Sequence, residues 1–300
     1  MNAIAIMGKE TAAENKRKIK KSKTKQIVFA ITFVIFTIYA ITLVYPFVWM
    51  ILSSLKSGSE YTDGNTFALP KSWAFKNYIS AMQALNINGV SFFSLIFNSL
   101  WQTVIGTALS IVITCMTSYV VAKYRFVGRN VIYAVAIIVM ILPIVGSLPA
   151  SYKLRIDMGI YDTPWQLITA TGGFGFNFLV LYGFFNNISW SYAEAALIDG
   201  AEDDAIFWRI MLPQAAPAIL TLTILAFIGG WNDYMGPILY YPSYPTLASG
   251  LYLYELIAKR TGNYPIYFAG AIISIIPIMV IFIVFQNSIM TSVSAGGLKG

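Results

Sequence analysis

The chain has 300 residues, of which 57% are hydrophobic and only 11% are charged. Soluble domains carry about 25% charged residues, so this composition indicates a protein whose solvent is lipid. The net charge of +7 does not indicate a nucleic-acid partner, because eight of the 20 Lys and Arg lie in the first 25 residues, as in a tail beside a membrane. Histidine is absent from the sequence and Cys115 is the single cysteine, which excludes His-based nucleophilic pairs and an internal disulfide.

Six apolar stretches are long enough to cross about 30 Å of hydrocarbon as helices. The first is too long for a signal peptide and follows a long polar lead-in, so we expect it to be retained. The sequence therefore predicts an all-α, polytopic membrane protein with tails at 1–25 and 291–300 and a transmembrane domain at 26–290. The predicted spans are 26–55, 92–122, 131–152, 165–188, 217–239 and 265–290.

The distribution of basic residues predicts that both termini are cytoplasmic. With the first tail inside, the cytoplasmic segments hold 13 Lys and Arg and the outer loops hold seven. The inner loop 189–216 departs from the excess of basic residues expected in cytoplasmic loops, because it has five acidic residues and only Arg209 as a basic one. Acidic residues count little in this rule, so the orientation stands and the loop needs its own explanation.

A glycine-rich run at 171–176 interrupts the fourth span. Such a run marks either close packing against another helix or a broken helix beside a transport path. The middle of each span lacks Asp, Glu, Lys and Arg, which opposes an ion-coupled carrier. The polar residues within spans are neutral, and their amides can bond a polar solute or one another.

The loop 189–216 has the pattern of a helix, a break and a second helix. Ser191 and Glu194 have capping-box spacing, and Gly200 can take the left-handed conformation that ends a helix. Asp203 suits the first turn of the second helix, which we expect Pro213 to end. The expected apolar face of that second helix is Ile206, Phe207, Ile210 and Met211. A helix lying on the membrane surface is the alternative, but such helices usually carry Lys or Arg, so the acidic loop favours a protein partner.

Residues 194–200 and 210–213 form the pattern E-A-A-x3-G-x9-I-x-L-P. This pattern resembles the cytoplasmic coupling loop of permeases in bacterial ATP-binding-cassette importers. Further segments are similar to the smaller permease of maltose-type importers, namely 45–56, 124–129, 162–165, 231–233 and 294–300. The resemblance implies a six-helix permease of the type I importer kind in the bacterial cytoplasmic (inner) membrane.

The resemblance also implies what the chain does and with which partners. It would form half of a translocation path for sugars or oligosaccharides, beside a second, larger permease. An ATPase dimer would carry ATP and Mg, and an extracytoplasmic sugar-binding protein would deliver the solute. The sequence lacks a G-x-x-x-x-G-K-[ST] phosphate loop, so ATP must be hydrolysed by another polypeptide. No catalytic residue, metal, cofactor or nucleic acid is expected for this chain.

Four groups of residues have expected roles, three from the resemblance and one, the translocation path, from the neutral amides within the spans. The ATPase contact comprises Glu194, Ala195, Ala196, Asp199, Gly200, Phe207, Ile210, Leu212 and Pro213. A second ATPase contact in the C-terminal tail comprises Gly296, Gly297 and Lys299. The translocation path comprises Asn98, Gln102, Asn177 and Asn232. The contact of the outer loop 240–264 with the binding protein comprises Tyr241, Tyr244, Gly250 and Tyr252.

Gly250 and Gly262 are expected in tight turns of this outer loop. The alternative for the loop is a membrane-interface segment whose tyrosines lie among lipid headgroups. For the whole chain, one alternative is a secondary carrier or channel for a neutral polar solute, which the coupling pattern opposes. Another is a membrane enzyme or a divalent-ion site in the acidic loop, but the five acids show no convergent ligand spacing.

Overall fold

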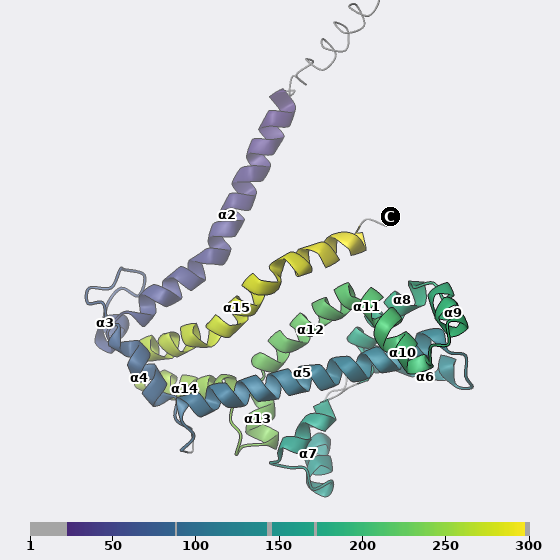
Figure 1. The fold of residues 1–300 in the computed structure, drawn as a ribbon. Helices are drawn as coiled ribbons and strands as arrows, with labels where there is room; N and C mark the ends of the chain where they lie inside the picture. Colours follow the sequence, from purple (N-terminus) through teal and green to yellow (C-terminus); the bar gives the residue numbers. More distant parts are fainter. Residues whose placement is uncertain (1–22, 88, 143–145, 171–172, 298–300) are drawn as a thin grey trace, which may run out of the picture. The chain divides into compact units, whose positions relative to one another are not determined.

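The computed structural model describes residues 23–87, 89–142, 146–170 and 173–297 (Figure 1). These residues form helices and connecting loops, and their β-structure is limited to an isolated bridge between Ile87 and Val90. The chain divides into two units, residues 1–52 and 53–300. The described residues thus confirm the predicted all-α class.

The first unit contains most of α2 (Lys23–Ser54), which corresponds to the first predicted span. Its apolar side chains are exposed along the helix; Phe33 and Phe36, for example, are 72% and 65% exposed. The helix is long and apolar enough to cross a membrane. Lipid or protein therefore has to cover these side chains in the assembled state.

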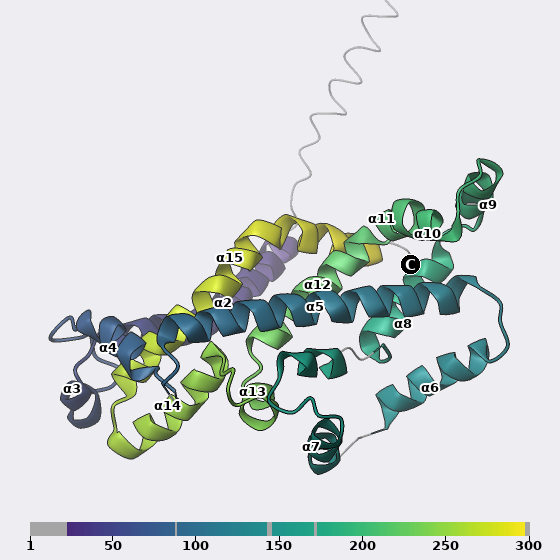
Figure 2. The same cartoon turned by 60° about the horizontal axis from the view of Figure 1, so that its bottom comes forward.

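The second unit is built around α5 (Phe92–Lys123), against which α8 (Phe176–Asn187) and α12 (Ala216–Trp231) pack. A further long helix, α15 (Tyr264–Gly297), packs against α12 and two shorter helices, α4 (Lys76–Ala84) and α14 (Leu247–Thr261). In both views α4 and α14 lie at one end of α5, and α9 and α10 lie at the other (Figure 1, Figure 2). The remaining elements before α9 are α3 (Gly58–Asp63), α6 (Arg129–Ile141), α7 (Ser147–Asp157) and η1 (Pro164–Ala170).

The formation of α5 follows from its sequence. The Ser91 side chain caps its first turn by accepting the N–H of Ser94. Within the helix, the hydroxyls of Thr114 and Ser118 donate to carbonyls one turn back, at 2.7 and 2.6 Å. Polar side chains are thereby satisfied inside an apolar helix, where an unpaired hydroxyl would be costly.

The predicted spans are only partly continuous helices. Within the described residues, three helices are long and apolar enough to cross a membrane, and a fourth candidate is the pair Asp203–Gln214 and Ala216–Trp231, which bends by 79°. The predicted third span divides into α6 and α7, and the fourth divides into η1 and α8. Gly146 and Gly175 precede the second helix of each pair with φ of 81° and 123°, which interrupts the helical backbone. The count of six spans stays a prediction.

The glycine run both breaks the fourth span and packs against α5, whereas its place beside a transport path stays a prediction. Residues 171 and 172 lie outside the described part, and α8 begins only at Phe176. Gly173 lies against α5, where its carbonyl accepts a hydrogen bond from Thr117 Oγ1 at 3.3 Å. The run therefore interrupts the helix and also brings the backbone close to a neighbouring helix.

The predicted outer loop 240–264 is largely helical, which corrects the expectation of a loop. It contains α14, which begins with a reciprocal capping box between Thr246 and Ser249. Gly250 lies inside α14 and not in a turn, and a Cβ added there would come within 3.0 Å of Leu95 Cδ1. Gly262, with φ of 74°, ends α14 as predicted.

Gly250→Val tests this packing. The larger side chain has to displace Leu95, so we expect the thermal unfolding midpoint of the detergent-purified chain to fall, at a cost of about 1–3 kcal/mol. Gly229→Val in α12 is the matched control, because a Cβ at Gly229 meets no described atom within 4 Å. Equal midpoints for the two variants would contradict the close contact at Gly250.

Candidate functional site

The acidic loop consists of α9 (Ser191–Ile198), α10 (Asp203–Ile206), η2 (Phe207–Met211) and α11 (Leu212–Gln214). Gly200 has φ of 81°, so the predicted left-handed break after the first helix is confirmed. Asp203 lies in the first turn of the second helix, as predicted.

One local expectation for this loop is wrong. The first helix begins after Trp190 without a side-chain cap: the Glu194 N–H donates to the Trp190 carbonyl at 3.1 Å, and Ser191 Oγ bonds Ser189 Oγ at 2.7 Å. Pro213 lies one residue before the end of the helical run Asp203–Gln214, close to the predicted end of the second helix. The bend of 79° comes after Gln214, and Pro217 lies near the start of α12 as predicted.

One face of the loop is buried against the rest of the second unit. Ala193 and Ile206 are 0% exposed, and Phe207 is 6% exposed. They belong to a cluster with Tyr119 of α5 and Phe185 of α8. The rings of Tyr119 and Phe207 lie 4.9 Å apart, and those of Tyr119 and Phe185 lie 5.5 Å apart. The inward face of the loop is therefore a continuation of the helical core.

Two hydrogen bonds attach the loop to the end of α5. Lys123 Nζ donates to the carbonyl of Ile188, which follows α8. The Tyr124 hydroxyl donates to Asp203 Oδ1 at 3.0 Å. Burial raises the pKa of Tyr124, as does its hydrogen bond to Asp203, so Tyr124 stays protonated and remains a donor at neutral pH.

The opposite face of the loop is exposed and carries acidic and apolar side chains. Ile198 is 86% exposed and Leu197 is 48% exposed, at the end of α9. The exposed acidic residues beside them are Glu194, Asp199, Glu202, Asp203 and Asp204. We call Leu197, Ile198 and these five acidic residues, together with Ala195 and Gly200, the outward face of the loop. An exposed, bulky apolar side chain surrounded by acids is the composition of a docking surface for a protein.

The predicted contact residues divide between the two faces. Glu194, Ala195, Asp199, Gly200 and Pro213 are exposed, and Ile210 and Leu212 are half-buried. The expectation that Ala196 and Phe207 form the contact surface is corrected, because both are buried against the chain's own core. Ile198 was missed, although it lies two residues after buried Ala196 and so on the other side of α9.

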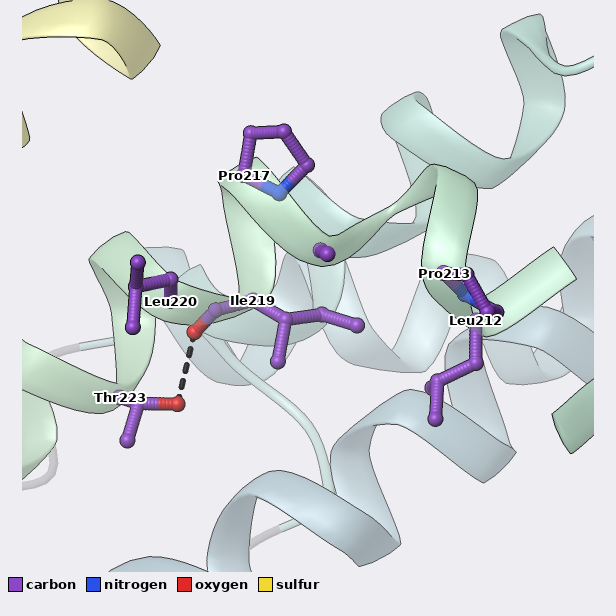
Figure 3. Close-up of a pocket in the computed structure, with 7 residues that line it drawn as sticks. Leu212, Pro213, Pro217, Ile219, Leu220 and Thr223 are labelled. Carbon is purple, nitrogen blue, oxygen red and sulfur yellow. Dashed lines mark hydrogen bonds between the residues drawn. The ribbon is translucent and has the colours of Figure 1, made fainter. Parts of the chain in front are cut away.

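A groove of about 550 Å³ adjoins the loop at the bend between α11 and α12. Figure 3 shows Pro213 and Pro217 on either side of this bend, with Leu212 and Ile219 along the groove. Thr223 donates its hydroxyl to the carbonyl of Ile219 at 2.7 Å, so this side chain is occupied within its own helix. The groove is apolar, and Leu212 and Pro213 are the loop residues that line it.

The four predicted path residues lie in different surroundings. On α5, Asn98 Nδ2 donates to the Pro245 carbonyl at 3.0 Å, and Gln102 Nε2 donates to the Tyr244 carbonyl at 2.8 Å. These two amides hold the segment before α14 against α5. Asn177 is half-buried in α8, and exposed Asn232 donates to the Ile228 carbonyl at 3.0 Å, after the end of α12. Gln102 also lines a cavity between α5, η1 and α12, whose walls hold both polar and apolar side chains.

The predicted binding-protein contacts are mostly packed within the chain. Tyr241 is 7% exposed, and Gly250 is buried inside α14. Tyr252 stacks on Tyr234 with ring centroids 4.5 Å apart, and Tyr244 meets the edge of Trp101 at 6.1 Å. In the C-terminal tail, Gly296 and Gly297 are the last residues of α15, and Lys299 lies outside the described residues.

Residues 110–293 match the family of binding-protein-dependent transport system inner membrane components, and this match includes the acidic loop and the C-terminal part of α5. The chain belongs to this family. It is a membrane-spanning permease of an ATP-binding-cassette transporter and not an enzyme.

Relatives and a solved structure resemble the permease over most of its length. The diacetylchitobiose uptake system permease protein NgcG of Streptomyces coelicolor is 30% identical, over 90% of this chain and 89% of the relative. The trehalose transport system permease protein SugB of Mycobacterium tuberculosis is 29% identical, over 85% of this chain and 92% of the relative. A chain in the crystal structure of a bacterial ABC transporter involved in the import of the acidic polysaccharide alginate is 26% identical, with a TM-score of 0.73, over 89% of this chain and 98% of that one.

The two faces of the loop predict unequal losses of stability when an isoleucine is shortened to alanine. Ile206→Ala leaves a cavity in the permease core, so we expect it to lower the free energy of unfolding by about 2–5 kcal/mol. Ile198→Ala, the same substitution on the outward face, is expected to change it by about 0.5 kcal/mol or less. Thermal unfolding of the two variants in detergent measures both effects. A larger loss for Ile198→Ala would contradict the assignment of the faces.

Proposed function

We propose that the permease forms half of the translocation path of an ATP-driven, binding-protein-dependent importer of sugars or oligosaccharides. The family supports ATP-driven transport with a binding protein. The relatives support the substrate class, because several carry the name of a sugar or oligosaccharide transport system. The other half of the path would come from a second permease, and a separate ATPase dimer would carry ATP and Mg.

The observation that carries the coupling proposal is the division of the acidic loop into a buried face and an outward face. The buried face joins α5, α8 and η2 through Tyr119, Phe185 and Phe207. The outward face presents Ile198 and the acidic residues to a partner. A partner that moves the outward face therefore also displaces the ends of the long helices. Such a mechanical link is required if closure of the ATPase dimer is to switch the translocation path between inward-facing and outward-facing access.

The charge of the outward face favours an ATPase surface that is basic around an apolar pocket. Five exposed acids surround Ile198, and Arg209 is the basic residue of the loop. Complementary charge fixes the register of docking, and the desolvated apolar anchor supplies affinity.

In this arrangement the loop and both termini lie in the cytoplasm of a bacterial cell, and the segment of α13 (Met235–Tyr240) and α14 faces the binding protein.

Substitution on the outward face is expected to uncouple the importer. Ile198→Asp places a charge where an apolar anchor docks, and Gly200→Pro prevents the φ of 81° that separates α9 from α10. We expect each variant to insert into the membrane, to lose at least tenfold in sugar uptake by reconstituted complexes, and to retain less ATPase on purification.

Val127→Asp is the matched control, because Val127 is a fully exposed apolar residue of a different predicted cytoplasmic loop. The control is expected to keep uptake and ATPase retention near the wild-type level. Normal uptake by both Ile198→Asp and Gly200→Pro would contradict the coupling proposal.

A further inference from the structure

The short helix α4 is apolar on its exposed side. Asn77 and Ala81 are buried on the inward side of the helix. Ile79 and Met82 are exposed, and so is Phe75, the residue before the first turn. At 3.6 residues per turn, Phe75, Ile79 and Met82 share one side of the helix, opposite the buried pair. A helix that faces water carries polar side chains on this side, so the pattern needs another explanation.

Trp73 extends the apolar side of α4 beyond the helix. Its exposed ring is stacked with that of Phe75, with the centroids 6.4 Å apart. Exposed Lys76 lies at the edge of the apolar side, one residue after Phe75. We call Trp73, Phe75, Ile79 and Met82 the α4 surface. Aromatic and aliphatic side chains bordered by a lysine are typical of segments that lie where a membrane meets water.

Hydrogen bonds hold the α4 surface beside the end of α2. The Ala74 N–H donates to the carbonyl of Leu55, the residue after α2, at 2.8 Å. Buried Asn77 Nδ2 donates to the carbonyls of Ser54 and Lys56, at 2.7 Å each. The surface is therefore fixed at the level where the first candidate span ends.

The packing of α4 against α15 places the surface at a similar level of a second span. The segment Tyr264–Gln286 of α15 is long and apolar enough to cross a membrane. A Cβ added at Gly270 would lie 3.9 Å from Ala81 Cβ, so the two helices meet there. Gly270 comes six residues after Tyr264, which is about 9 Å along the helix axis. This is the depth at which a span passes from the headgroups into the hydrocarbon.

We propose that the α4 surface is a membrane-interface anchor. Its aromatic and aliphatic side chains insert between lipid headgroups and the first part of the acyl chains, and Lys76 meets the lipid phosphates. Lipid fits better than the binding protein, because the surface lies level with the first turns of a span, below the reach of a water-soluble partner. The anchor goes beyond the proposed function, since it does not depend on the solute. It fixes the height of two span ends while other helices move.

Spin labelling of the assembled importer in lipid bilayers tests the anchor. Ile79→Cys carries a nitroxide on the α4 surface, and Met82→Cys replaces it if the first variant does not assemble. Cys115 is 2% exposed and stays in place. Electron paramagnetic resonance compares collisions of the label with oxygen, which concentrates in hydrocarbon, and with a water-soluble nickel chelate. We expect oxygen to dominate, with the label about 5–10 Å into the boundary between headgroups and acyl chains.

Val127→Cys is the matched control, because Val127 is a fully exposed apolar residue in a predicted cytoplasmic loop. Collisions with nickel should dominate at this position.

Two results at the α4 surface would overturn the anchor. Dominant collisions with nickel would show that the surface faces water. Low collision rates with both reagents would show that a protein covers it, the second permease if the rates are low without binding protein, and the binding protein if they fall only on its addition. Neither result bears on the coupling proposal, which concerns residues of the acidic loop.

Discussion

Tyr119, near the C-terminal end of α5, packs where the long helices meet the acidic loop. Its ring contacts Phe185 of α8 and Phe207 of η2, and the surrounding cluster includes Ala193 of α9 and Leu222 of α12. Protein interiors are close-packed, so a displaced side chain forces its neighbours to move. The loop therefore cannot shift as a free surface segment. Its position is set by the same burial that holds α5, α8 and α12 together.

This constraint explains why the loop has two chemically different faces. Small and apolar residues, such as Ala193 and Ile206, are fully buried, which brings the loop backbone close to α5 and α8. The acidic residues are left on the outside together with Ile198. The bond from Tyr124 to Asp203 adds a directional link at the edge between the two faces. A docked partner would thus act on the spans through packing, with a hydrogen bond fixing the register.

The general architecture and the pattern of the loop could be predicted from the sequence, because both depend on local signals. Apolar length predicted α2, α5 and α15, and Gly200 predicted the break between α9 and α10. The apolar face of the second helix was predicted too, and Ile206, Phe207 and Met211 are buried. A hydrophobic period does not show whether an apolar face packs on the chain's own core or on a partner. Ala196 and Phe207 were consequently placed on the wrong face.

Other features depend on contacts between distant residues, which composition does not reveal. From the sequence, Gly250 was expected in a turn. The structure shows instead that a glycine is needed there because Leu95 of α5 packs against its backbone. The amides of Asn98 and Gln102 were candidates for the path, and both prove to bind the backbone before α14. The loop pattern indicated the family without structural information, whereas the role of each side chain required the fold.

The most direct test of the account is a photo-crosslinking experiment on the assembled importer. A photoreactive phenylalanine analogue replaces either Ile198 or Ile206, which have the same side chain and lie eight residues apart on opposite faces of the loop. The account predicts that the probe at Ile198 crosslinks to the ATPase subunit and that the probe at Ile206 crosslinks only within the permease. Crosslinking to the ATPase from Ile206, or from neither position in a complex that transports sugar, would contradict it.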